Sequence, residues 1–111
     1  MEPEKEMKAL ELLNSPEAWC QESPGKDVQG NKVFALDPEA VQWCTLGAIQ
    51  KEYQPLQWEE IMDRLLRVLS VSEQAIEELT RSDKACCLTE WNDDVERSFE
   101  DIREALDAAD I

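Results

Sequence analysis

Apolar residues recur along most of the chain at steps of three and four, which is the spacing of an amphipathic helix. The longest such pattern covers residues 57–81, and within it Ser70-Val71-Ser72 offers a break, with Ser72 as the cap of a separate helix. A final helix is predicted after Ser98, because Asp101 stands three positions later and completes a capping box. The pattern therefore predicts a mainly α protein.

Two further helices are predicted over residues 7–13 and 38–53. The first is followed by a short turn that Ser15 and Pro16 begin, and the second has Asp37 as its cap and Pro38 in its first turn. Gly47 lies inside the second helix, where it costs stability unless another element approaches closely. We expect residues 88–91 to be extended and residues 92–94 to form a turn.

Turn-forming residues surround a short stretch with strand character, and they predict a β-hairpin over residues 28–35. The fold class is therefore mainly α: a small single domain, residues 1–111, of four to five helices with a short β-hairpin (α+β at the margin). Its core is predicted to contain Trp19, Val41, Cys44, Ile61, Leu65, Phe99, Ile102 and Leu106.

The apolar seam of residues 57–81 has a heptad-like spacing that allows two interpretations. It packs inside the domain, or it forms a homodimer interface. The residues of that interface would be Ile61, Leu65, Val68 and Leu79. Three heptads are short for a coiled coil, which favours packing within the domain.

Charge narrows the possible partners. The chain has 26 acidic and 11 basic residues, a formal net charge of −15, and no histidine. Such a surface attracts cationic partners and disfavours direct binding of nucleic acid or of an anionic membrane. The absence of histidine removes the commonest general base and metal ligand. The N-terminus has neither the basic start nor the apolar run of a secretory signal, so we expect a cytoplasmic protein.

The four cysteines have no metal-binding spacing, and they are interpreted as small buried hydrophobic residues, Cys44 and Cys87 among them. The alternative is a reactive thiol at Cys86 or Cys87. Cys86 is the stronger candidate because Lys84 stands near it in the sequence and would lower the pKa of its thiol.

Three segments together resemble a domain-of-unknown-function family of bacterial, notably actinobacterial, and phage genomes. They are an upstream Trp19, the segment Asp-Pro-x-Ala-Val-x-Trp-Cys-x-Leu-Gly-Ala at residues 37–48, and Trp91-Asn92-Asp93 followed by a terminal helix. The resemblance covers most of the chain and implies a helix around Trp43 and Cys44 and a turn at Trp91-Asn92-Asp93. It implies no activity, and it fits a small protein carried by mobile elements.

The C-terminal segment, residues 90–111, carries nine acidic residues and two arginines, a net charge of −7. It is either a solvated helix face or a partner-binding surface that mimics nucleic acid. Duplex DNA carries one charge per about 1.7 Å of axis, so mimicry requires acids of the N-terminal helix to join it, for example Glu2, Glu4, Glu6 and Glu11. The predicted partner-binding residues are Glu96, Glu100, Asp101, Glu104, Asp107 and Asp110.

These observations favour a non-enzymatic acidic protein of phage or mobile-element type. It would inhibit a host nucleic-acid-binding defence protein by occupying its basic groove. The alternatives are a small ligand-binding or enzymatic protein that uses the Trp91-Asn92-Asp93 turn, and a self-associating module. We expect no cofactor; Asp93, Asp94 and Glu96 form an acidic cluster but lack the spacing of a calcium loop.

Overall fold

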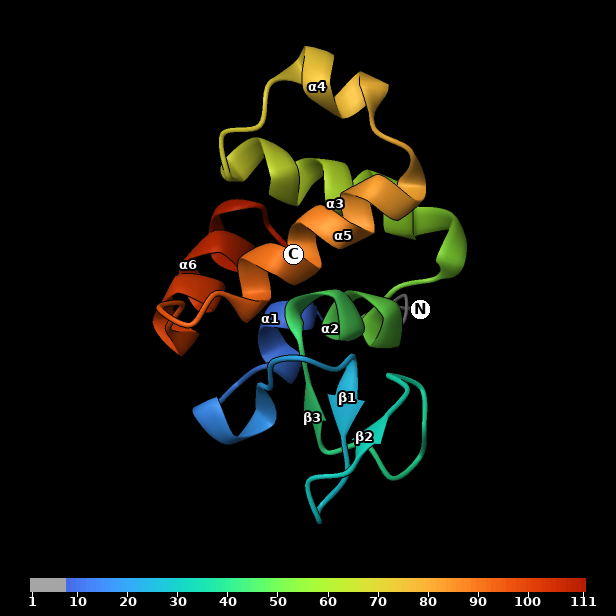
Figure 1. Cartoon of the computed structure of the whole chain (residues 1–111), viewed down its shortest axis with the longest axis vertical. Coiled ribbons are helices and arrows are strands. Elements are labelled where there is room, and N and C mark those ends of the chain that lie inside the picture. Colours follow the sequence, from blue (N-terminus) through green and yellow to red (C-terminus); the bar gives the residue numbers. More distant parts are fainter. Residues whose placement is uncertain (1–7) are drawn as a thin grey trace, which may run out of the picture.

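The computed structural model describes residues 8–111, which fold into a helical body with a small sheet at one end (Figure 1). The predicted mainly α class is confirmed, although the described residues contain six α-helices where four to five were expected. In chain order the elements are α1 (Ala9–Leu12), a 3-10 turn η1 (Pro16–Ala18), β1 (Gly25–Lys26), β2 (Lys32–Val33), β3 (Gln42–Trp43), α2 (Thr45–Glu52), α3 (Pro55–Val68), α4 (Glu73–Glu78), α5 (Arg81–Asp93) and α6 (Phe99–Ala108).

The sheet has three antiparallel strands in the order β2-β1-β3, with Gly25 of β1 opposite Val33 on one side and Trp43 on the other. A hairpin was predicted over residues 28–35; its first strand lies earlier, at residues 25–26, and the third strand was not predicted. Because β3 takes residues 42–43, the helix predicted over residues 38–53 begins only at Thr45. Asp37 accepts a hydrogen bond from the backbone of Glu39 in a turn instead of capping that helix, and Val41 is exposed rather than buried.

The predicted break in the longest helical pattern is confirmed. Ser70 adopts a left-handed conformation with φ of 73°, and the Ser72 hydroxyl accepts a hydrogen bond from the backbone N–H of Ala75 at the start of α4. The homodimer seam as predicted does not form one exposed stripe. Ile61 and Leu65 are buried inside the domain, whereas Val68 is exposed and Leu79 half-buried on separate sides of the break.

Two predictions for residues 88–94 are wrong. Residues 88–91 are helical rather than extended, and Asn92 and Asp93 form the last turn of α5 rather than a separate turn. A capping box fixes the N-terminus of α5. The Thr80 hydroxyl accepts a hydrogen bond from the Asp83 N–H, and the Asp83 carboxylate accepts one from the Thr80 N–H. This capping box was present in the sequence.

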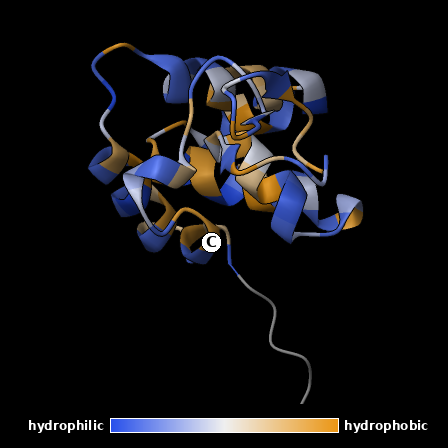
Figure 2. Ribbon diagram, turned by 90° about the horizontal axis from the view of Figure 1, so that it is seen from below, coloured by the Kyte–Doolittle hydropathy of each residue, from blue (hydrophilic) through white to orange (hydrophobic). Residues whose placement is uncertain are grey.

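The core lies where the helices face one another, and Figure 2 shows hydrophobic positions gathered there with hydrophilic ones outside. Of the predicted core residues, Cys44, Ile61, Leu65, Ile102 and Leu106 are buried; Trp19 and Phe99 are half-buried, and their rings lie 6.3 Å apart. Within residues 8–111 no helix is long and apolar enough to cross a membrane. The largest fully buried apolar side chains are Leu13, Ile49, Leu65, Leu66, Leu88, Ile102, Leu106 and Ile111.

Candidate functional site

Asn92 is the centre of a buried hydrogen-bond network. Its Oδ1 accepts from the indole N–H of Trp19 at 2.8 Å, and from the backbone N–H and hydroxyl of Thr45 at 2.9 and 2.6 Å. Its Nδ2 donates to the Cys20 carbonyl at 3.2 Å and to the Asp93 carboxylate at 2.9 Å. Both Oδ1 and Nδ2 of the Asn92 side chain are therefore hydrogen-bonded to other groups of the protein.

The network joins three parts of the chain that are distant in sequence. The Gln21 side-chain amide donates to the carbonyls of Asn92 and Asp94 at 2.9 and 3.0 Å, and the backbone N–H of Glu22 donates to the Asp93 carboxylate at 2.9 Å. Within the Trp91-Asn92-Asp93 segment, which was considered as a ligand-binding turn, Asn92 and Asp93 therefore link α5 to the start of α2 and to the loop before the sheet. Sequence reasoning missed Thr45, because no local pattern connects it to a residue 47 positions later.

Cys44 and Cys20 lie in the same region and are buried, as predicted for Cys44. Cys44 is the N-cap of α2, and its Sγ accepts a hydrogen bond from the Gly47 N–H at 3.2 Å. Burial raises the pKa of the Cys44 thiol and raises that of Cys20 to about 12. Both thiols are therefore protonated at neutral pH, which makes them poor nucleophiles.

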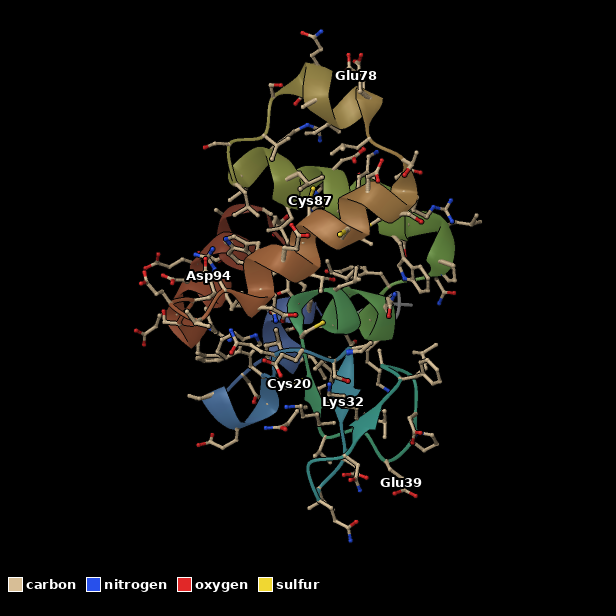
Figure 3. The ribbon with its side chains drawn as sticks, viewed as in Figure 1. Cys20, Lys32, Glu39, Glu78, Cys87 and Asp94 are labelled. Atoms are coloured by element: carbon tan, nitrogen blue, oxygen red, sulfur yellow. The ribbon has the colours of Figure 1, made fainter. Side chains whose placement is uncertain are left out.

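Cys86 and Cys87 are exposed, so the prediction that Cys87 is buried is wrong; Figure 3 shows Cys87 projecting from α5. A hydrogen bond with Glu90 raises the pKa of the Cys86 thiol, opposite to the activation expected from Lys84. The Lys84 ammonium is buried and instead lies 2.8 Å from carboxylate oxygens of both Glu59 and Asp63. These ion pairs fasten α5 to α3.

The predicted partner-binding acids fall into two groups. Asp101 caps α6 by accepting from the Ser98 N–H, and Asp110 forms an ion pair with Lys8. Both interactions lower the pKa of the carboxyl group concerned. The other four carboxylates are exposed, and none of them forms an ion pair with another residue of 8–111: Glu96, Glu100, Glu104 and Asp107.

Glu100, Glu104 and Asp107 form a stripe along α6, because residues at steps of four and three share one face of a helix. The opposite face carries Ile102 and Leu106 and is buried. We call these three residues the α6 acidic stripe. They lie on one rigid helix that points its carboxylates away from the core.

Most basic side chains near this surface bind groups of the protein itself. Arg103 donates to the carbonyls of Leu10 and Leu13 at 2.9 Å each, which fixes α1 beside α6. Seven of the ten basic residues in the described part of the chain contact a carboxylate or a backbone carbonyl: Lys8, Arg64, Arg67, Arg81, Lys84, Arg97 and Arg103. Few cations are left to balance the outer carboxylates.

The acidic residues do not gather into a metal centre. Residues 8–111 contain no group of three or more cysteine, aspartate or glutamate side chains placed to hold an ion. Asp93, Asp94 and Glu96 form an acidic cluster in the sequence. The Asp93 carboxylate accepts hydrogen bonds from the Glu22 N–H and the Asn92 amide, and the Asp94 carboxylate accepts one from the Glu96 N–H. These carboxylates therefore stabilise backbone turns.

Comparison with known proteins places the chain in one family. A model described as a family of unknown function (DUF6197) matches residues 7–110. No curated protein and no solved structure matches the chain significantly. The match covers nearly all of the chain, and it confirms the expected membership of a family of unknown function.

Proposed function

The chain belongs to the DUF6197 family, whose function is unknown, and we propose that it is a non-enzymatic protein that binds a basic surface of another protein through α6. The observation that carries this proposal is the unequal use of its charges. Basic side chains bind internal carbonyls and carboxylates, whereas the α6 acidic stripe of Glu100, Glu104 and Asp107 faces solvent. An outward field of one sign steers an oppositely charged partner.

The spacing of the stripe is compatible with nucleic-acid mimicry. Residues 100 and 107 are separated by about 10 Å along the helix axis, so the three carboxylates are spaced by about 5 Å along that axis. One strand of duplex DNA carries one phosphate per about 3.4 Å of its axis. Glu11 is exposed on α1, which contacts α6. The other acids named for this role, Glu2, Glu4 and Glu6, lie outside the described residues.

The finer proposal is that the partner is a host nucleic-acid-binding protein, such as a nuclease effector of a defence system, and that the chain acts as a phage or mobile-element inhibitor. A groove that binds phosphates by Lys and Arg is the surface that exposed carboxylates complement. The net charge of −15 and the absence of histidine support this over an enzymatic role.

The test is the affinity of the protein for a panel of basic nucleic-acid-binding proteins at increasing salt. Glu100→Lys, Glu104→Lys and Asp107→Lys are combined in one variant. We expect affinity for a true partner to fall at least about tenfold with this reversal and to fall steeply with salt, since exposed charges are screened beyond about 10 Å at 0.1 M. Nucleic acid should compete for the same partner.

The matched control reverses three exposed acids elsewhere, namely Glu17, Glu39 and Glu77, and changes the net charge equally. A smaller loss in this control locates binding on α6. An equal loss of affinity in both variants contradicts the proposed α6 surface. An affinity that does not depend on the salt concentration contradicts it as well.

A further inference from the structure

We infer that a groove beside the α6 acidic stripe receives an apolar side chain from a basic amphipathic helix of the partner protein. This inference rests on the proposed function and names the kind of partner segment that the surface fits. The groove has a volume of about 440 Å³ and lies between the end of α3, the end of α5 and one side of α6.

The wall and floor of the groove are apolar. Val68 and Leu69 come from the end of α3, Trp91 from α5, and Ala105 and Ala108 from α6. The two alanines leave room between the larger side chains, and Ala108 and Val68 are exposed. An open groove with this largely apolar lining can receive one anchoring apolar side chain, and such anchors provide much of the energy of protein–protein binding.

The edges of the groove carry charge. Glu104 lines it from α6 and also belongs to the acidic stripe, so an apolar anchor in the groove brings flanking residues next to Glu100 and Asp107. Asp101 lines it one turn earlier, where the Arg97 guanidinium lies 3.9 Å from its carboxylate. The net charge of the protein, −15, and the exposed carboxylate of Glu104 therefore favour lysine or arginine as the neighbours of the anchor.

Arg97 fixes the shape of the groove at its α5 end. Its guanidinium lies 4.6 Å from the centroid of the Trp91 ring, and its Nε donates to the Trp91 carbonyl at 2.8 Å. These two contacts fix the position of the Arg97 side chain over the Trp91 ring.

A helix suits this groove better than an extended peptide. The elements around it are all helices or the loops between them, and the strands β1, β2 and β3 lie at the other end of the molecule (Figure 1). Within residues 8–111, therefore, no strand edge lies beside the groove with which a bound extended peptide could pair. An amphipathic helix presents anchors at steps of three and four and places basic residues on either side of them.

Two synthetic peptides of about 18 residues, five helical turns, test the inference. Both have the same number of leucines and lysines. In one the leucines form a single helical face, and in the other they are permuted so that no face is apolar. Affinity is measured by titration, and the methyl resonances of Val68, Ala105 and Ala108 report the place of binding by NMR.

We expect the amphipathic peptide to bind at least about tenfold more tightly than the permuted one, with the largest shifts at the methyl groups of these three residues. Ala108→Trp fills the groove without changing the charge of the protein. The affinity of this variant for the amphipathic peptide should fall to its affinity for the permuted peptide. Val68→Gln, at the facing wall, should do the same. Val28→Trp adds the same ring at an exposed position of the sheet end and should change neither affinity.

Equal affinity of the two peptides for the wild type overturns the groove inference, and so does a preference that survives Ala108→Trp. In either case, loss of peptide binding in the Glu100, Glu104 and Asp107 reversal still supports the proposed function. Binding of neither peptide also overturns the inference, and the panel of basic proteins then tests the proposed function separately.

Discussion

Replacing Asn92 by alanine should destabilise the protein more than any single change at its surface. The substitution removes the acceptor of three donors: the Trp19 indole N–H, the Thr45 N–H and the Thr45 hydroxyl. Asn92 and Thr45 are both fully buried, so water does not replace the lost partner. The Cys20 carbonyl loses its donor from Asn92 as well.

The expected cost follows from the groups left unpaired. A buried donor or acceptor without a partner costs about 1–3 kcal/mol, and relaxation of the Thr45 hydroxyl recovers part of that. We therefore expect a loss of about 3–5 kcal/mol of unfolding free energy, a large part of the roughly 5–15 kcal/mol that holds a domain of this size together. At about 4 °C or more per kcal/mol, the melting temperature should fall by at least about 12 °C.

The assay is urea unfolding followed by circular dichroism, with the melting temperature measured in parallel. Asn14→Ala is the matched control, because Asn14 is exposed and should cost less than about 0.5 kcal/mol. If Asn92→Ala lowers the unfolding free energy by less than about 1 kcal/mol, the Asn92 network does not hold the start of α2 and the loop before the sheet to α5.

Two other predictions concern packing and thiols. Gly47→Ala should destabilise the protein by about 2 kcal/mol or more, measured by the same unfolding assay, because its added Cβ would lie 2.0 Å from the Pro24 carbonyl oxygen; a neutral effect would contradict this contact. A thiol reagent at neutral pH should label Cys86 and Cys87 in the native protein, and Cys20 and Cys44 only after denaturation, with Cys86 slowed by its contact with Glu90. Four fast thiols in the native state would show that the region of Cys20 and Cys44 is open.

The internal use of cations explains how so acidic a chain folds. Arg64 donates to the carbonyls of Ala109 and Asp110, and Arg103 donates to those of Leu10 and Leu13, so arginines tie α3 and α1 to the C-terminal helix. Each guanidinium satisfies carbonyls at the end of a helix, where the backbone lacks partners. The cost is an outer surface with an uncompensated negative charge, which is the property that the proposed function uses.

Local signals in the sequence were sufficient for the helix starts that depend on neighbouring residues. The Ser98 and Asp101 capping box, the break at Ser72 and the buried face of Ile102 and Leu106 were predicted and are confirmed. The close approach at Gly47 was also expected, because a glycine inside a helix needs compensation. The equally local capping box of Thr80 and Asp83 was overlooked, and α5 was therefore divided wrongly.

The sequence by itself determined the helical class, the main apolar faces and the acidic character, because caps, periodicity and charge act over a few residues or over the whole composition. Only the tertiary structure decided that Gln42 and Trp43 pair with β1, that Asn92 binds Trp19 and Thr45, and that Asp110 forms an ion pair with Lys8. These outcomes depend on contacts between residues tens of positions apart. Such contacts form only when the packing of the core brings their elements together, and no local preference encodes them.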